Sequence, residues 1–357
     1  MAKYRKYLEF AALLFLAVAI IWWFGRRLDW VQVKVAVQRS DWRLILLGAG
    51  IVLLGYLWRA IRWQVLLAPL TKASLREIWI ATTVGFGAVL LIGRAGEVVR
   101  PVVLPMRDTR VRPAAAFVTI MVERLYDTIA VVTIFALNLL WLKPSGETTE
   151  AFSRARIVGW ILVVLLAVVV TLLIWFRRRS PSVIGRLDRK IRGRSSLGAR
   201  LKRGVLSTLE QLATALSVMS NIRQLTVSVC LSVLLWGSVA LGNLLVCRAF
   251  GLPFGVSQIL FVMGWSMVGS AVPTPGGAAG AFHAATGAAL VLLGVPREQA
   301  AAVAIILHLV DFSPAAFFGF FYFLRGDINI TRLRALISIR SVEHAVEDEK
   351  VALAEGV

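Results

Sequence analysis

Long apolar runs are the feature that most restricts how this chain can fold. They cover residues 8–24, 44–67, 114–142, 157–176, 225–250 and 300–324. Most of them reach the roughly 20 residues that a helix needs to cross a bilayer. Lipid offers the backbone no hydrogen-bond partners, so each spanning run must satisfy its own backbone as a helix. The sequence therefore predicts an all-α polytopic membrane protein with about six full spans.

Composition and charge support a membrane protein whose surface meets anionic lipid. Hydrophobic residues make up 58% of the chain, against about 45–50% in soluble proteins. The formal net charge is +20, and the basic residues cluster beside the apolar runs. That placement favours anionic lipid headgroups, not nucleic acid, as the partner. The two cysteines, Cys230 and Cys247, lack metal-binding spacing, and no cofactor or metal is expected.

One apolar region, residues 272–283, cannot form a continuous helix. Pro273 and Pro275 each remove a backbone donor. Its glycines are Gly276, Gly277 and Gly280. Irregular backbone is tolerated inside lipid only where it is buried in protein or lines a wet cavity. The flanking runs, 257–272 and 281–295, are short for spans, so we expect a re-entrant helical hairpin whose loop lines the working cavity.

A second break lies earlier in the chain. The run 78–92 is about 15 residues, which is short for a span. The sequence Gly-Arg-Ala-Gly-Glu follows at 93–97, with its charges on Arg94 and Glu97. A second short apolar piece, 98–106, carries Arg100. Two short halves around a charged break also predict a re-entrant hairpin.

Three ionisable residues lie together inside the run 114–142. Glu123 and Asp127 are four residues apart and share a helix face, and Arg124 precedes Asp127 by three. Such groups are costly in lipid unless they are paired or face water. They form either a self-neutralised structural ion cluster or a functional site.

Two other pairs of ionisable residues also have a structural and a functional interpretation. Arg59 and Arg62 end the run 44–67; they either anchor its end at the membrane interface or meet a lipid phosphate. His308 and Asp311 lie in the last run, where an intramembrane histidine is either a satisfied core residue or part of a site.

An offset of 184 residues superimposes the two unusual regions. The aligned pairs are Gly93 with Gly277, Gly96 with Gly280, Arg124 with His308, and Asp127 with Asp311. The repeat halves cover about 78–142 and 257–324. Three predicted spans separate the two breaks, and an odd number places them on opposite sides of the membrane. The sequence thus predicts an inverted repeat, a plan that many transporters use.

The distribution of basic residues predicts the orientation. The loops 107–112 and 177–203 and the tail carry most of them, so these segments are expected on the cytoplasmic side with both termini. The first external loop, which contains Arg26 and Arg27, is a mild exception. We expect one helical transmembrane domain, 1–325, and a cytosolic tail, 326–357.

Four short motifs, spread over nearly the whole membrane region, resemble one family. They are Arg59-Ala-Ile-Arg-Trp63, the break at 93–97 with Arg100, Glu123-Arg124-x-x-Asp127, and Pro273-Thr-Pro-Gly-Gly277 through Gly294-Val295. In order and spacing they resemble the transmembrane, flippase-type domain of lysylphosphatidylglycerol synthase, as a stand-alone member. The resemblance implies re-entrant helix pairs and a role in handling lipids in a bacterial or archaeal cell membrane.

The chain departs from the family pattern at two positions. His283 stands where the family usually has a glutamate, and His308 stands where it usually has an arginine. Both replacements introduce side chains that titrate near neutral pH. The family's aminoacyl-transferring domain has no counterpart, so synthesis of an aminoacylated lipid is not implied.

These features together predict a lipid flippase or transporter, not an enzyme, for a phosphate-bearing lipid that is anionic, aminoacylated or glycosylated. Arg94, Arg100 and Arg124 would attract the headgroup. Glu97, Glu123 and Asp127 would position those arginines, and His283, His308 and Asp311 would serve the opposite half. The alternatives are an accessory protein that docks a lipid-modifying enzyme or glycosyltransferase, and a membrane-embedded lipid-group transferase. A second copy of the chain is a further partner to test.

Overall fold

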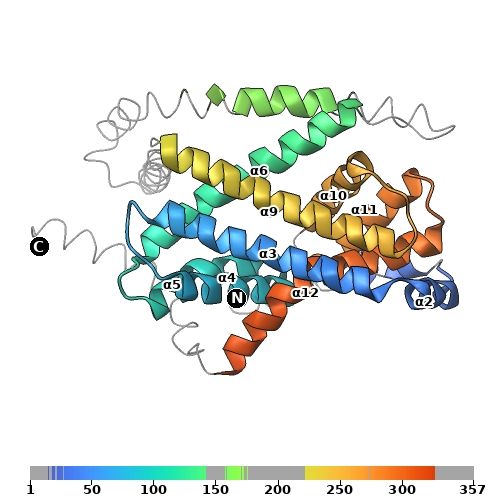
Figure 1. The fold of residues 1–357 in the computed structure, drawn as a ribbon, viewed down its shortest axis with the longest axis horizontal. Coiled ribbons are helices and arrows are strands. Elements are labelled where there is room, and N and C mark those ends of the chain that lie inside the picture. Colours follow the sequence, from blue (N-terminus) through green and yellow to red (C-terminus); the bar gives the residue numbers. More distant parts are fainter. Residues whose placement is uncertain are drawn as a thin grey trace, which may run out of the picture.

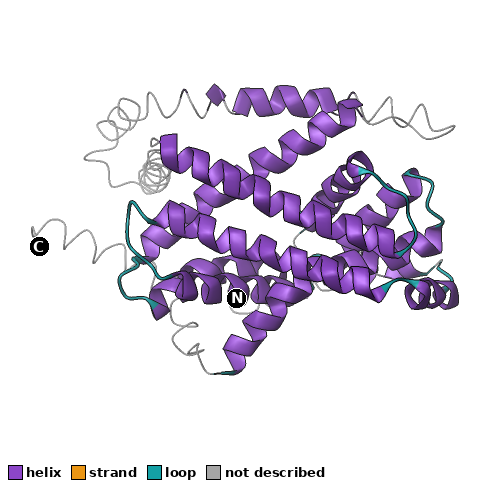
Figure 2. Ribbon diagram, viewed as in Figure 1, coloured by secondary structure: helices purple, strands orange, loops and turns teal. Residues whose placement is uncertain are grey.

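A computed structural model describes the chain at residues 15, 18–20, 22–26, 28–141, 157, 159–169, 171, 172, 175, 222–272 and 274–325. The helices are α2 (Trp30–Arg39), α3 (Trp42–Leu67), α4 (Leu75–Ile92), the 3₁₀ helix η1 (Gly93–Val98), α5 (Val99–Arg107), α6 (Pro113–Trp141), α9 (Ile222–Ala249), α10 (Val256–Ser270), α11 (Ala279–Leu292) and α12 (Arg297–Leu324). Within these residues the fold is entirely helical, as the sequence predicts (Figures 1 and 2).

Four of the described helices, α3, α4, α9 and α12, are long and apolar enough to cross a membrane. The 29-residue α6 is about 44 Å long at the usual rise per residue. The prediction that this is a membrane protein is therefore confirmed, while the number of crossings stays a prediction. The run 8–24 lies mostly outside the described residues, and so do positions 158, 170, 173, 174 and 176 of the run 157–176. The basic stretch 177–203 and the tail 326–357 lie outside them entirely.

Polar caps extend several helices beyond the apolar runs that predict them. The run 78–92 indicates a piece too short to span, but α4 has 18 residues and qualifies as a span by length and hydropathy. Ser74 caps its first turn by accepting a hydrogen bond from the backbone of Glu77. Glu77 in turn pairs with Arg107 at the end of α5. The sequence also gives no apolar signal for α2, which begins at the capping carboxylate of Asp29.

Small residues let the long helices approach one another closely. α3 and α9 lie side by side along much of their length (Figure 1). A Cβ on Gly48 would lie 3.0 Å from the carbonyl oxygen of Gly242, which belongs to α9. α12 packs on α4 in the same manner, because a Cβ on Gly319 would lie 2.3 Å from the carbonyl oxygen of Thr83. Such contacts are typical of helix association in membranes.

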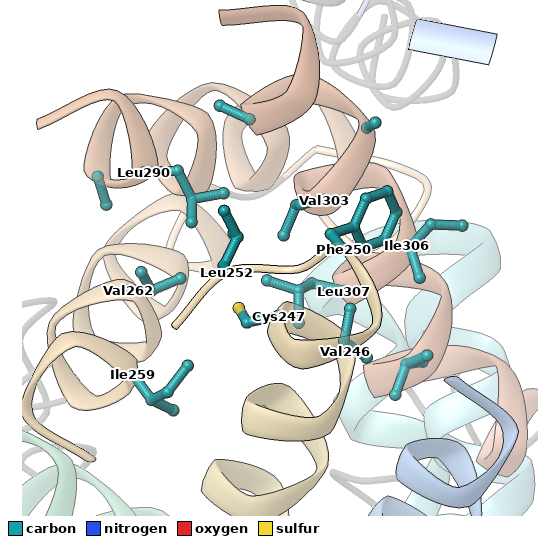
Figure 3. Packing of buried hydrophobic residues seen from close by; sticks show 14 of the residues in the cluster. Val246, Cys247, Phe250, Leu252, Ile259, Val262, Leu290, Val303, Ile306 and Leu307 are labelled. Carbon is teal, nitrogen blue, oxygen red and sulfur yellow. The ribbon is translucent and has the colours of Figure 1, made fainter. Parts of the chain in front are cut away.

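Two helix pairs contain the breaks: α4 and α5, which flank η1, and α10 and α11, which flank the loop 271–278. An apolar core fixes the second pair against the long helices. Figure 3 shows the end of α9 inserted between these helices and α12. The residues it labels are Val246, Cys247, Phe250, Leu252, Ile259, Val262, Leu290, Val303, Ile306 and Leu307. Cys247 is fully buried and behaves as a small hydrophobic residue. The loop between α10 and α11 is thereby held at a defined position.

Both interruptions predicted from the sequence are present, and they touch. Gly93 begins η1 with φ +66°, and a Cβ there would lie 2.5 Å from the carbonyl oxygen of Thr274 in the loop between α10 and α11. In that loop Gly276, Gly277 and Ala278 all have positive φ, which explains why the helix cannot continue. Pro273 lies outside the described residues. The two breaks are therefore neighbours in space although about 180 residues separate them in sequence.

Candidate functional site

Glu123 of α6 is at the centre of a buried cluster of charges. Its side chain has no exposed surface. Arg100 of α5 donates to both of its carboxylate oxygens, at 2.6 and 3.1 Å. Arg124 donates to Oε1 at 2.9 Å, and Arg59 of α3 approaches the same oxygen at 3.4 Å. Three helices thus converge on one carboxylate.

Asp127, one turn further along α6, binds the two arginines of α3. Arg59 donates to Oδ2 at 2.9 Å, and Arg62 donates to Oδ1 at 2.7 Å. Arg62 also donates to the hydroxyl of Ser232 on α9 at 2.7 Å, and its side chain is fully buried. The interpretation of Arg59 and Arg62 as interface anchors is therefore wrong, because both turn inward to meet α6.

Aromatic rings cover the guanidinium faces. The Arg100 guanidinium lies 4.4 Å from the ring centre of Trp63 and 5.7 Å from that of Phe86. Arg59 lies 5.0 Å from the same Phe86 ring. Cation–π contacts of this kind are strongest when water is excluded. They help arginines to remain charged where hydration is poor.

The cluster carries more positive than negative side chains among those described. Four guanidiniums, from Arg59, Arg62, Arg100 and Arg124, meet three carboxylates, from Glu123, Asp127 and Glu97. Glu97 lies 4.0 Å from the Nε of Arg124. The side chain of Arg94, a predicted site residue, lies outside the described residues. The sequence analysis offers an ion cluster of α6 residues that neutralise one another as one alternative. That description is incomplete, because arginines of α3 and α5 also bind the two carboxylates of α6.

A cavity of about 160 Å³ lies beside the cluster. Its wall is built by α3, α4, η1, α6, α9, α10, α11, α12 and the loop before α11. Arg59, Arg124 and Glu97 line it on the charged side, and rings such as Phe86 and Trp236 line it elsewhere. The Arg124 side chain is 34% exposed, whereas Arg62 and Arg100 are almost fully buried. Arg124 is thus the arginine of the cluster that is most available to a ligand.

The other side of the cavity is polar but holds no arginine. Asp311 of α12 and Gly277 of the loop line it. Tyr56, one turn before Arg59 on α3, donates a hydrogen bond to the main-chain carbonyl of Asp311 at 2.7 Å. His308 lies behind the lining, with Nε2 3.4 Å from the carbonyl oxygen of Gly277. Its ring centre lies 4.9 Å from that of His283.

Residues 10–319 match the lysylphosphatidylglycerol synthase transmembrane region. The chain belongs to this family. The match covers both helix pairs, the charge cluster and the cavity, and it confirms the resemblance indicated by the four motifs. Comparison with curated proteins gives no match. Membership supports a lipid-related role in a membrane for this member of the lysylphosphatidylglycerol synthase transmembrane family.

The cavity joins residues from both predicted halves of this family member. Glu97 and Arg124 line it from the half 78–142, and Gly277 and Asp311 line it from the half 257–324. Arg59 of α3, which precedes the first half, also lines it. Other predicted site residues lie behind this lining. They are Arg62, Arg100, Glu123 and Asp127 in the charge cluster, His283 and His308 behind the loop, and Pro275, Gly276 and Gly280 in or next to the loop.

Sequence reasoning missed the aromatic wall and Tyr56. Helical spacing could have identified Tyr56, because it lies three residues before Arg59 and therefore on the same face of α3. The sequence contains no comparable signal for Phe86, Trp236, Phe282 and Phe312, since aromatic residues are common in every apolar run. Only the packing of four helices selects these particular rings.

Proposed function

We propose that this protein carries a lipid with a phosphate-bearing headgroup between the leaflets of a bacterial or archaeal cell membrane. The headgroup would enter the cavity between the two broken helix pairs, and the acyl chains would stay in lipid. A volume of about 160 Å³ suits a phosphate or a small headgroup, because a cavity of about 150 Å³ holds a benzene ring.

The observation that carries this proposal is the concentration of arginines on one side of the cavity. Four described guanidiniums meet the carboxylates of Glu123, Asp127 and Glu97 there, in a part of the molecule that is surrounded by membrane-length helices. Charges buried in such surroundings need partners, so the excess of arginine on this side favours an anion. Arginine also matches the geometry of phosphate oxygens with paired N–H donors.

Arg124 and Arg59 are proposed to contact the phosphate, since both line the cavity. The carboxylates of Glu123 and Asp127 would hold these arginines in place, because each already accepts hydrogen bonds from them. Carriage fits this arrangement better than covalent turnover, since both carboxylates are engaged by arginines and neither is placed to act as a general base.

We further propose that the two helix pairs are re-entrant hairpins related by an inverted repeat, with both termini in the cytoplasm. Two glycine pairs at the offset of 184 support the repeat. Gly85 and Gly269 each face the returning helix of their own pair, where an added Cβ would lie 2.3 Å from Arg100 and 2.5 Å from Ala281. Gly93 and Gly277 each mark a break with positive φ.

A leaflet-exchange assay tests the proposal. Purified protein is reconstituted into liposomes with phosphatidylglycerol that carries a fluorescent headgroup label, and dithionite reports the label in the outer leaflet. Exchange is expected to be faster with protein, and faster for this lipid than for labelled glucosylceramide, which has no phosphate. Arg124→Gln should lower the rate about tenfold, the value of one charge-assisted hydrogen bond. Arg43→Gln, an exposed arginine at the other end of α3, is the matched control.

Equal exchange with and without protein, for anionic and glycosylated lipids alike, would exclude lipid carriage. An accessory role would then gain support if deletion of 177–203 abolished cellular function while Arg124→Gln left it intact. Turnover of a lipid by the reconstituted protein would instead support the transferase alternative.

A further inference from the structure

Asp311 differs from the other acidic residues around the cavity in having no cationic partner. Glu123 and Asp127 each bind at least two arginines. Asp311 also lines the cavity, but no ion pair joins it to any described side chain, and its Oδ1 atom has no hydrogen-bond partner. A carboxylate without a partner is energetically costly inside a membrane-spanning helix, so such residues usually have a functional role.

The groups around Asp311 come from several of the helices that pack on α12. Tyr56 of α3 binds its main-chain carbonyl, and Asn243 of α9 is the side chain that interacts with its carboxylate. Phe86 of α4 contributes only an apolar ring to the same cavity. Across the cavity lie three charged side chains, Arg59, Arg124 and Glu97. The arginines are within the same cavity, yet all of their described ion pairs are with α6 and η1.

The two histidines nearby are less suited to exchange protons with the cavity. His308 is almost fully buried, and its Nε2 atom is occupied by the carbonyl oxygen of Gly277. His283 lies behind His308 and does not line the cavity; its own Nε2 atom has no partner. Phe282 and Phe312 pack against the His308 ring. Among the described side chains, Asp311 is therefore the carboxylate that faces the cavity without a charged partner.

We propose, building on the proposed function, that Asp311 binds a proton that travels with the anionic lipid, so that the protein is a proton–lipid symporter. Protonation of Asp311 removes one negative charge from the cavity wall and strengthens the attraction of Arg59 and Arg124 for a phosphate. Binding of the phosphate anion in turn favours the protonated form, since the two events are linked by the same electrostatic interaction.

The charge balance of the proposed step is simple. One proton enters Asp311 and one monoanionic headgroup enters beside the arginines, so the loaded cavity has the same net charge as the empty one with Asp311 ionised. Moving a neutral pair avoids carrying an unbalanced charge through the membrane, which is costly. The proton leaves Asp311 on the far side together with the lipid, and no covalent bond changes apart from this O–H bond.

A pH-gradient experiment in the same liposomes tests the coupling. Labelled phosphatidylglycerol is equilibrated at equal pH, and then one side is acidified. With the wild-type protein the label should accumulate in the leaflet away from the acidic side, by up to about tenfold per pH unit for one proton per lipid. A pH-sensitive dye inside the liposomes should report protons entering with the lipid.

Two variants make the test specific to Asp311. Asp311→Asn should lose both the accumulation and the proton movement, because an amide resembles the protonated carboxyl and cannot release the proton. Its exchange rate at equal pH is measured in the same liposomes, and both readouts are expressed relative to that rate. Asp29→Asn is the matched control, since this aspartate caps α2 outside the cavity and asparagine is an equally good cap. It should accumulate the label like the wild type.

The outcomes separate the two proposals. Exchange that occurs but does not respond to the pH gradient overturns the proton site and leaves lipid carriage standing. Accumulation that persists in Asp311→Asn also overturns it. No exchange under any condition removes both. Infrared difference spectra of the purified protein give a readout without lipid, because the carboxylic acid bands that appear on acidification should include one component in the wild type that Asp311→Asn lacks; identical difference spectra for the two proteins would contradict the assignment.

Discussion

α6 and α12 present the same pattern of residues in opposite electrostatic surroundings. Each helix carries an aspartate three residues after a basic residue, Arg124 before Asp127 and His308 before Asp311. On α6 the aspartate binds two arginines of α3 at 2.7 and 2.9 Å. On α12 the aspartate has no ion pair with any side chain in the described part of the chain, and phenylalanine rings surround the histidine.

The comparison shows that the spacing of a basic residue and an aspartate along a helix does not determine whether the aspartate forms ion pairs. Arg59 lines the same cavity as Asp311 but turns to α6, where two carboxylates compete for it. The charge cluster is consequently built to stay charged, whereas Asp311 is left to respond to the contents of the cavity. Four experiments would break or sharpen this contrast.

Glu123→Gln is expected to have the largest effect. It removes the carboxylate that binds Arg100 through both oxygens and leaves that buried guanidinium without its charge partner. Loss of one member of a buried ion pair typically costs about 3–5 kcal/mol. Thermal unfolding in detergent should show a large fall in the midpoint. Asp311→Asn should change the midpoint little, because no arginine depends on it; equal losses in both variants would end the distinction between the two sites.

Gly93→Ala tests whether contact between the two breaks matters. The new Cβ would meet the carbonyl of Thr274 at 2.5 Å, and a residue other than glycine is strained at φ +66°. We expect a loss of about 1–3 kcal/mol from backbone strain alone, measured by denaturation in detergent, and slower lipid exchange.

The matched control is Gly237→Ala in α9, where a Cβ would meet no atom within 4 Å. This variant should be neutral or slightly stabilising, since alanine favours a helix. A Gly93→Ala protein that is as stable and active as this control would mean that the breaks can separate freely.

The third prediction compares the lipid-exchange rates of two variants, Arg124→Gln in α6 and His308→Gln in α12. Arg124 is partly exposed to the cavity, so its loss should lower phosphatidylglycerol exchange about tenfold. His308 lies behind Gly277, so glutamine, which can keep a hydrogen bond to that carbonyl, should change the rate less than about threefold. If His308→Gln lowered the exchange rate more than Arg124→Gln, the headgroup would be assigned to the side of the cavity near His308 and not to the side near Arg124.

The smallest expected effect concerns an ion pair outside the membrane-spanning helices. Arg110 donates to both carboxylate oxygens of Asp108, each at 2.8 Å, and holds the pKa of that carboxyl below its ordinary value. The stabilisation is therefore complete above the unfolded-state pKa of about 4 and is lost as pH falls through the folded-state pKa.

Asp108→Asn should consequently lower the unfolding midpoint slightly at neutral pH and flatten its decline in acid. The pair is exposed on the Arg110 side, so the shift should be far smaller than that of Glu123→Gln. Melting curves from pH 7 to pH 3 provide the measurement. An identical acid profile in both proteins would mean that other carboxylates dominate that decline.

Much of the helical framework was predictable because lipid allows few alternatives. The apolar runs located α3, α6, α9 and α12 to within about three residues at each end, the usual margin set by polar caps. The Pro and Gly residues located both breaks, since they act on the backbone directly. α2 could not be found in this way, because its ten residues are amphipathic and short.

The candidate site was predictable only as a set of residue types. Glu123, Arg124 and Asp127 stand out because ionisable residues are rare in apolar runs. The inward orientation of Arg59 and Arg62 could not be predicted from the sequence, since arginines at the end of an apolar run are equally compatible with the interface. That choice depends on the position of α6 relative to α3.

The sequence by itself determined that the chain is helical, membrane-embedded and broken at two places, because each of these properties follows from local chemistry in lipid. The tertiary structure decided which charges meet. It brought Gly93 against Thr274, directed four arginines toward the carboxylates of α6 and η1, and left Asp311 facing the cavity without an ion-pair partner among the described side chains. Which charged side chains form ion pairs depends on the distances between packed helices, and a local sequence pattern does not contain that information.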